Sequence, residues 1–313
     1  MQQLTLFTHG AALDDVPLTN VPDHCKEFAS LQHVTISNQL LTTIDITKIY
    51  TIPNLSTLVV DEFRMPKDVA FVLLPDDYKP TKLVSIEFRR TNCLPIGLCV
   101  EFLLKNHPLL KILPWSIQHT GYRGDRFDSK AVSRSLSALH SYLTKLHISY
   151  DNSYYIANDC QLDFSDFIAL QYLEIHERIT LARNVPATRP QYSRQDLPGR
   201  LPASLQTLKL FSSSRCSGIS FDPNSQALGE QLSGPVDYSW IVALARHPEL
   251  VNTQLSIIDL TERACWVVER SLAWRGKPVK IPDLVEWVYP EEIIETFRRS
   301  GIKLRVMLKP LLE

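Results

Sequence analysis

The sequence predicts an α/β solenoid, in which a curved parallel sheet lies on the concave side and helices lie on the convex side. Three observations indicate this fold. A six-residue apolar pattern recurs along the chain, a proline precedes several of its copies, and helical periodicity fills the segments between copies. Recurrence at intervals of a few tens of residues is typical of repeat architectures, whose units cannot bury their apolar side alone.

The recurring pattern is a hexad, Leu-x-x-aliphatic-x-aliphatic. Its first leucines are separated by steps of 24 to 45 residues, and three of the seven steps are 27 or 28 residues. The regular copies are Leu31/Val34/Ile36, Leu55/Leu58/Val60, Leu83/Ile86/Phe88, Leu143/Leu146/Ile148, Leu170/Leu173/Ile175 and Leu205/Leu208/Leu210. A looser copy stands at Leu110/Leu113/Trp115, and a degraded one at Leu250/Thr253/Leu255.

Each hexad is expected to form one strand. Its fourth and sixth positions alternate with the two-residue period of a strand, and its first leucine enters from the preceding turn. Proline stands two residues before the first leucine at Pro53, Pro108 and Pro248. Because proline ends a helix and extends the residue before it, it separates an outer helix from the next strand.

The segments between hexads favour helices. Residues 129–142 place Val132, Leu136 and Leu139 on one stripe, and residues 238–246 place Trp240, Ile241 and Leu244 inward. Residues 98–103 carry a third apolar face, and residues 291–300 a fourth helix, followed by a strand through Ile302 and Leu308. Strand and helix therefore alternate along the chain, as an α/β solenoid requires.

The lines at residues 52–60 and 201–210, of the forms x-Pro-x-Leu-x-x-Leu-x-Leu and Leu-Pro-x-Ser-Leu-x-x-Leu-x-Leu, resemble leucine-rich-repeat proteins. The irregular lengths are similar to the degenerate repeats of fungal F-box/leucine-rich-repeat proteins. The resemblance implies an irregular leucine-rich-repeat solenoid and a role in protein recognition. Such proteins usually carry an F-box that recruits a ubiquitin-ligase adaptor, and residues 1–30 do not resemble one. The asparagine that often follows the hexad is replaced by Gln39, Phe63 and Thr91.

The expected organisation is one domain in three parts. Residues 1–30 form an N-terminal cap or flexible lead, residues 31–260 the solenoid, and residues 261–313 a C-terminal cap in the same domain. Proline and arginine mark an insertion at residues 181–202, and serine, glycine and asparagine mark another at residues 211–235. Lys303 and Arg305 are expected to protect an edge of the sheet.

The resemblance also implies a binding surface, because the non-leucine strand positions of a leucine-rich solenoid line its concave face. Mixed charge with aromatic anchors is the composition of a protein–protein patch. The partner-binding residues expected on this exposed face are His33, Asp61, Glu87, Arg89, Lys145, His147, Tyr172, Glu174, His176, Lys209 and Phe211.

Composition and motifs exclude several functions. The net charge of −1 gives no global field for nucleic acid, and the longest apolar stretch is too short to span a membrane. We find no phosphate-binding loop, nucleophile elbow or zinc-protease motif, and therefore expect no cofactor, no metal and no catalytic residue. Without a signal peptide or paired cysteines, the six cysteines indicate an intracellular protein, cytoplasmic or nuclear.

The sequence therefore favours a non-enzymatic protein–protein interaction module. It would serve as a substrate-recognition arm of an F-box-like ubiquitin-ligase assembly. The alternative is a carbohydrate-active enzyme on a β-solenoid or α/β scaffold, using paired carboxylates in a groove. Its candidate carboxylates are Asp61, Glu87 and Glu174.

Overall fold

The structure is a computed structural model of the full chain, and it describes thirteen parts of that chain. These are residues 2–7, 29–37, 49–61, 82–92, 107, 109–118, 129–150, 162–180, 197–213, 239–247, 254–263, 285–286 and 290–308. The chain divides into two compact units, Met1–Asn152 and Ser153–Glu313, at a boundary that the expected organisation does not contain. Each unit is built on its own parallel strands.

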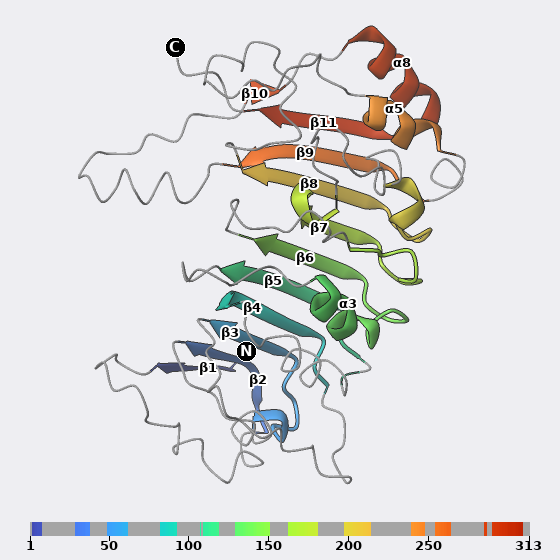
Figure 1. Ribbon diagram of the computed structural model, residues 1–313. Coiled ribbons are helices and arrows are strands. Elements are labelled where there is room, and N and C mark those ends of the chain that lie inside the picture. Colours follow the sequence, from blue (N-terminus) through green and yellow to red (C-terminus); the bar gives the residue numbers. More distant parts are fainter. Residues whose placement is uncertain are drawn as a thin grey trace, which may run out of the picture. The chain divides into compact units, whose positions relative to one another are not determined.

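In its described residues, the first unit contains six parallel strands that pair in the order of the chain (Figure 1). They are β1 (Gln2–Phe7), β2 (Leu31–Ser37), β3 (Thr57–Asp61), β4 (Ser85–Asn92), β5 (Ile112–Gln118) and β6 (Lys145–Tyr150). Strand β1 lies within residues 1–30, where the sequence predicts a cap or a flexible lead, and pairs with β2. The hexads predict β2 to β6, whereas β1 carries no hexad.

The hexad residues are aligned across neighbouring strands. Val34 of β2 lies opposite Leu58 of β3, and Leu58 lies opposite Ile86 of β4. Further along, Trp115 of β5 lies opposite Ile148 of β6. Every residue of the regular hexads and of the looser copy is 6% exposed or less. The prediction that these leucines form one buried face of a parallel sheet is confirmed within each unit.

Backbone hydrogen bonds join the strands where each begins. The carbonyl of Ser56 accepts from the N–H groups of Val84 and Ser85 at 2.9 and 3.1 Å, and the carbonyl of Val84 accepts from Lys111 and Ile112. The same pattern returns in the second unit, where the carbonyl of Gln206 accepts from two residues of the next strand. These bonds extend the pairing into the turn before each strand.

Hydroxyl side chains reinforce these links. Ser56 Oγ donates to the carbonyl of Gln32 at 3.0 Å, Thr144 Oγ1 to that of Lys111 at 3.0 Å, and Ser256 Oγ to that of Gln206 at 3.2 Å. Each hydroxyl stands directly after the first leucine of its strand. Serine and threonine thus satisfy carbonyl groups in the turns of a chain that lacks the asparagine of regular leucine-rich repeats.

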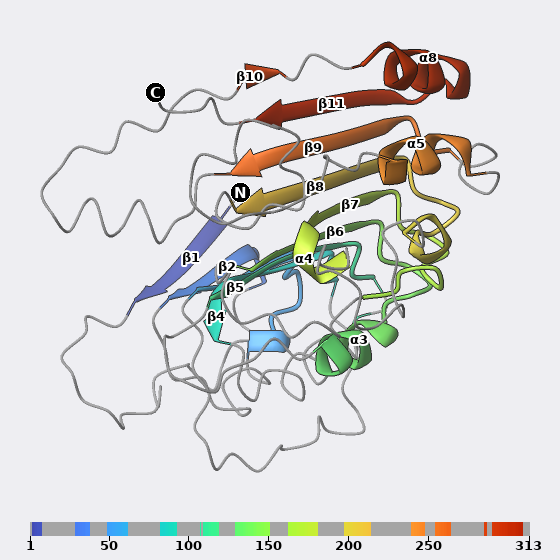
Figure 2. The same cartoon turned by 45° about the horizontal axis from the view of Figure 1, so that its top comes forward.

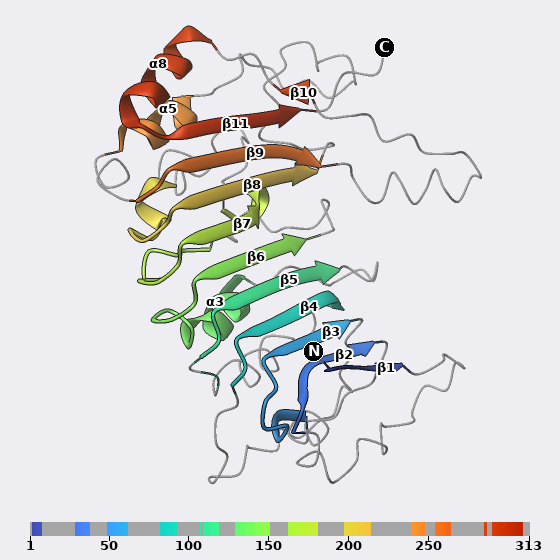
Figure 3. The same ribbon diagram turned by 180° about the vertical axis from the view of Figure 1, so that it is seen from behind.

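Helix α3 (Ser129–Ser137) confirms the helix predicted between β5 and β6, although it ends earlier than expected. Figures 1 and 3 place it on one face of the sheet of its unit. Val132 and Leu136 are buried on the helix and Leu139 in the turn after it, so the predicted stripe packs into the core. The helix predicted at residues 98–103 lies outside the described residues.

The part of the second unit that the structure describes contains five paired strands in the order β7, β8, β9, β11, β10. Strands β7 (Tyr172–His176), β8 (Thr207–Ser213), β9 (Ile257–Arg263) and β11 (Lys303–Leu308) are parallel, and β10 (Val285–Glu286) runs antiparallel to β11. Strand β9 corrects the degraded hexad. The residues aligned with Leu208 and Leu210 are Ile258 and Leu260, so Leu255 is the first position of its repeat, not the last.

The described parts of the two predicted insertions are ordered elements. Residues 197–202 contain a single 3-10 turn, η3 (Pro198–Arg200), in which Leu197, Pro198 and Leu201 are buried. Phe211–Ser213 complete strand β8. Burial holds residues 197–202 and strand pairing holds Phe211–Ser213, and the rest of both predicted insertions lies outside the described residues. A short helix, α4 (Glu177–Thr180), follows β7 directly.

Helices α5 (Ser239–Arg246) and α8 (Glu291–Ser300) pack against each other near the start of β11 (Figure 2). Trp240, Ile241 and Leu244 of α5 are buried, as predicted. Helix α8 ends at Gly301, whose φ of 70° is the left-handed conformation that favours glycine after a helix. This turn leads directly into β11.

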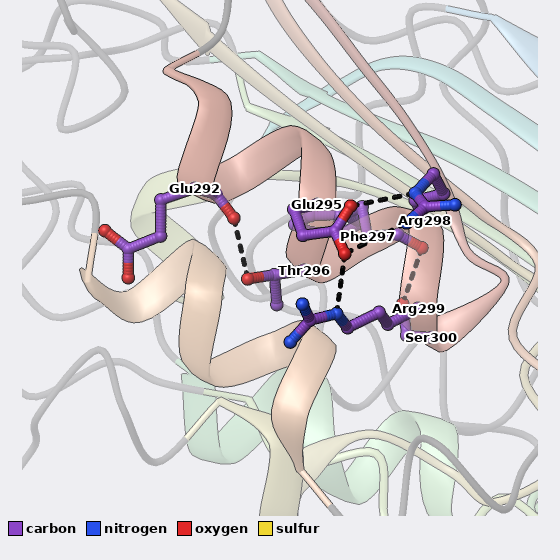
Figure 4. A network of polar contacts seen from close by, with 7 residues as sticks. All are labelled: Glu292, Glu295, Thr296, Phe297, Arg298, Arg299 and Ser300. Atoms are coloured by element: carbon purple, nitrogen blue, oxygen red, sulfur yellow. Dashed lines mark hydrogen bonds and ion pairs between the residues drawn. The ribbon is translucent and has the colours of Figure 1, made fainter.

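The outer side of α8 carries a polar network, drawn in Figure 4. The carboxylate of Glu295 accepts from Arg298 Nε at 2.8 Å and from Arg299 Nε at 2.7 Å. These hydrogen bonds lower the pKa of Glu295 to about 2, and the one from Arg298 has the larger effect. The arginines lie in the last turn of the helix, where their positive charge also interacts favourably with the negative end of the helix dipole.

Candidate functional site

Each sheet has a second face, opposite its buried leucines, which we call the polar face. Successive side chains of a strand point to opposite sides, so the residues between the hexad positions share this face. Every predicted site residue lies on it. His33, Asp61, Glu87, Arg89, Lys145 and His147 belong to the first unit, and Tyr172, Glu174, His176, Lys209 and Phe211 to the second.

On the first unit, Glu87 and Arg89 of β4 form a forked ion pair. Arg89 Nε lies 2.6 Å from Glu87 Oε1, and Arg89 Nη2 lies 3.1 Å from Glu87 Oε2. Asp61 of β3 stands in register with Arg89. Lys145 is exposed, and His147 is half-buried. The polar face of this unit therefore offers both signs of charge to solvent.

A bulge follows Phe88 in β4. Phe88 pairs with Trp115, but the next pair joins Thr91 to Ile117, so β4 has one residue more than β5 in this stretch. Such a bulge changes the direction of the strand and of the side chains beside it. Arg89 stands at its start, where it reaches back to Glu87 on its own strand.

On the second unit, four charged residues of alternating sign stand in register across the sheet. Glu174 of β7 lies opposite Lys209 of β8, Lys209 opposite Asp259 of β9, and Asp259 opposite Arg305 of β11. We call these four residues the charge row. Unlike charges on adjacent strands attract, because facing side chains are about 5 Å apart. The pairing of the strands therefore places each charge of the row beside the opposite charge.

Neighbouring side chains hold the carboxylates of the charge row. Tyr172 donates its hydroxyl to Glu174 Oε2 at 2.6 Å, and Thr261 Oγ1 donates to Asp259 Oδ1 at 2.9 Å. Arg305 donates to Asp259 Oδ2 through Nε at 3.1 Å and also through Nη2. Burial of a carboxylate is costly unless such partners are present. Both carboxylates meet this condition.

Aromatic rings border the charge row on either side. Lys209 Nζ lies 5.3 Å from the centre of the Tyr172 ring, within the range of a cation–π contact. The rings of His176 and Phe211 meet edge to face, with centres 5.4 Å apart. Each of these contacts joins a residue of β7 to a residue of β8 on the polar face. The sequence pattern alone does not predict them.

No family model, curated protein or solved structure matches this chain. Among the residues that the structure describes, no group of histidine, cysteine, aspartate and glutamate is placed to hold a metal ion. Within the same ranges, no helix is both long and apolar enough to cross a membrane. The function is therefore inferred from the two polar faces.

The expected exposure of the face is wrong at three positions. Glu174, His176 and Phe211 are 8%, 2% and 6% exposed. The hydrogen bond from Tyr172 keeps the Glu174 side chain against the sheet, and the edge-to-face contact buries His176 and Phe211 against each other. These three residues therefore belong to the packed interior of the second unit and are not part of its solvent-exposed surface.

Sequence reasoning missed Asp259 and gave Arg305 only an edge role. The degraded hexad at residues 250–255 placed the repeat five residues too early, so the strand that carries Asp259 was not recognised. The signal was present, because Leu255, Ile258 and Leu260 form a complete hexad.

The carboxylates of the alternative, enzymatic hypothesis are already engaged. Both oxygens of Glu87 accept from Arg89, and Glu174 accepts from Tyr172 while nearly buried. Glu87 and Glu174 would have to give up these hydrogen bonds to act as the paired acid and base of such an enzyme.

Proposed function

We propose that this chain is a non-enzymatic protein-interaction module that binds its partner on the polar faces of its sheets. The observation that carries the proposal is the contrast between the two sides of each parallel sheet. One side is apolar and fully buried, whereas the other carries charged and aromatic side chains with partial exposure. Parallel sheets normally have both faces covered, so a polar, partly open face is suited to a partner.

The composition of the polar face supports a protein partner. Glu87, Arg89 and Lys145 supply both signs of charge on the first unit, and Tyr172 supplies an aromatic side chain on the second. Arginine and tyrosine are enriched among residues that dominate protein–protein binding. The interlocked carboxylates hold these side chains in place before binding, which reduces the entropy cost of forming a complex.

Site-specific crosslinking tests the proposal. A photo-crosslinking amino acid in place of Lys145 stands on the polar face of the first unit, and one in place of Lys130 stands exposed on α3 as the matched control. In the native cells, we expect a discrete protein adduct from position 145 that position 130 does not give. Identical adducts from both positions, or none from position 145, would contradict the proposal.

The resemblance to F-box/leucine-rich-repeat proteins adds a finer hypothesis. The captured partner would be a substrate of a ubiquitin ligase, and this chain its substrate-recognition arm. Purification of the full-length protein from cells treated with a proteasome inhibitor tests this hypothesis. A ubiquitin-ligase adaptor that co-purifies with the crosslinked partner supports it, whereas a partner whose ubiquitination is unchanged by loss of this chain removes it.

A further inference from the structure

The charge row is neutral in its formal charges, but its two signs are not equally exposed. Glu174 is 8% exposed and Asp259 is 3% exposed. By contrast, half of the Arg305 side chain is accessible (51%), and Lys209 is half-buried with its ammonium group over the Tyr172 ring. The row thus buries its anions and presents its cations.

The next row on the same face strengthens this asymmetry. It runs from Tyr172 through Thr207 and Ile257 to Lys303, each in register with the next. Lys303 is exposed, and Ile257 is one of the few large apolar side chains that are open to solvent, at 39%. Lys209, Ile257, Lys303 and Arg305 therefore form one surface, which we call the basic patch.

The three cations of the basic patch outnumber the two buried carboxylates beside them, Glu174 and Asp259, by one formal charge. Among the described residues of this face, the carboxylate open to solvent is Glu286 of β10, which stands in register with Met307 of β11. The two carboxylates inside the patch are held by Tyr172, Thr261 and Arg305. An exposed group of cations around an apolar side chain is complementary to acidic residues that flank an apolar one.

The geometry points to an acidic protein segment in extended conformation as the occupant of the basic patch. This inference rests on the proposed function and names the chemistry of the partner. Lys303 and Arg305 are two residues apart on β11, which separates them by about 7 Å, the same interval as alternate side chains of an extended peptide. Lys209 and Arg305 lie two strands apart, at about 10 Å. Acidic side chains at alternate positions would face Lys303 and Arg305, and the side chains between them would point away from the sheet.

A nucleic acid is the less suitable polyanion. The whole chain has a net charge of −1, so it lacks the excess of basic residues that gives nucleic-acid binders their affinity. An exposed isoleucine between the cations also matches a peptide better than a sugar–phosphate backbone. Single-stranded DNA is accordingly the competing ligand in the test.

Fluorescence anisotropy on the full chain tests the inference. The probe is a labelled peptide of alternating glutamate and leucine, compared with a twin in which glutamine replaces glutamate, and with labelled single-stranded DNA. We expect the acidic peptide to bind, with an affinity that falls as salt rises, and the twin and the DNA to bind at least about tenfold more weakly. Equal binding of the twin, or DNA binding as tight as the peptide, would overturn the inference.

Two substitutions locate the binding. Lys303→Glu and Lys209→Gln alter the basic patch but keep both hydrogen-bond donors to Asp259, Arg305 and Thr261. Lys130→Glu makes the same charge change as Lys303→Glu on α3 of the other unit. We expect each patch variant to lose about tenfold in peptide affinity with unchanged circular dichroism, and Lys130→Glu to bind as wild type. Patch variants that fold and bind the peptide normally overturn the inference.

Failure of this inference can be told apart from failure of the proposed function. If the crosslinked partner is captured equally by wild type and Lys303→Glu, the chain is an interaction module whose partner is not held by the basic patch. If position 145 captures no partner, the proposed function fails, while the peptide measurement still decides whether the basic patch selects acidic segments.

Discussion

Arg305 on β11 lies opposite Asp259 on β9 and donates two hydrogen bonds to a carboxylate that is almost fully buried. The two residues are 46 positions apart in the chain, and the pair crosses from the last long strand of the second unit to its neighbour. It supports the charge row and helps to hold β11 in register. Its loss should therefore affect stability as well as recognition.

Replacing Asp259 with asparagine tests the structural part of this role. Asp259→Asn keeps the shape of the side chain but removes the charge that Arg305 and Thr261 contact. We expect the free energy of unfolding to fall by about 1–3 kcal/mol. The loss is smaller than for a fully buried pair because Arg305 stays half-exposed and can be hydrated again. Urea unfolding of the purified protein measures it.

The control for this variant is Arg246→Gln. It removes the exposed pair between Arg246 and Glu292, whose atoms are 3.4 Å apart, and should cost less than about 0.5 kcal/mol. Equal costs for the two variants would show that the Asp259 pair contributes no more than a surface contact.

Two adjacent leucines give a direct test of the buried face. Leu110 is fully buried in the core of the first unit, whereas Leu109 is 50% exposed. Leu110→Ala should lower the free energy of unfolding by about 2–5 kcal/mol, because it leaves a cavity in a packed core. Leu109→Ala should change it by no more than about 0.5 kcal/mol. Similar effects of the two substitutions would contradict the assignment of the first hexad position.

The hydroxyl groups between repeats should contribute measurably to stability. Ser204 Oγ lies 3.1 Å from the carbonyl oxygen of Phe167 and 2.9 Å from that of Leu170, so it ties the start of β8 to the turn before β7. Ser204→Ala should cost about 1 kcal/mol in urea unfolding. Ser137→Ala, which removes an exposed hydroxyl bonded within α3, is the control and should be nearly neutral. A neutral Ser204→Ala would show that water satisfies these carbonyls equally well.

His107 should make the first unit sensitive to acid. Its side chain is fully buried, its ring meets that of Tyr50 edge to face at 4.4 Å, and burial lowers its pKa from 6.5 to about 4. Above pH 6.5 the imidazole is neutral in both the folded and the unfolded chain. As the pH falls from 6.5 toward 4, only the unfolded chain takes up the proton, so stability is progressively lost.

The expected size of this loss follows from the shift in pKa, and is about 3 kcal/mol at pH values below 4. Unfolding free energies of wild type and His107→Gln, measured between pH 7.5 and about 4.5, separate the effect of lost packing from the effect of protonation. Near neutral pH, the difference in unfolding free energy between the two proteins reports the packing lost in His107→Gln. This difference should become smaller as the pH falls, because only wild type loses stability through protonation of His107. Parallel curves for the two proteins would contradict the proton linkage.

Much of the fold could be predicted from the sequence because one local pattern is repeated. A leucine followed by alternating apolar residues specifies both a strand and its buried side, so the hexads from Leu31 to Leu210 locate strands in both units. Strand β1 was not predicted because it lacks the leucine that begins each hexad. Strand β9 was placed too early because Leu255 was taken as the end of one hexad instead of the start of another.

The candidate site was less accessible to sequence reasoning. Alternation places Glu174 and Lys209 on the polar face, but their alignment with Asp259 depends on pairing between strands that are about fifty residues apart. Burial of Glu174 depends on the Tyr172 hydroxyl, and burial of His176 on the Phe211 ring. Such contacts are set by tertiary register, which no local pattern encodes.

The doubled hydrogen bonds at the strand starts also bear on how such a chain can change in length. At five of the described strand starts one carbonyl accepts from two N–H groups of the next repeat, as that of Ser56 does from Val84 and Ser85. A duplicated module from one such carbonyl to the next would present the same acceptor at one end and the same donors at the other. Growth by whole modules is therefore compatible with the fold. A single residue added within a strand would instead turn its leucines toward the solvent and its charges toward the interior.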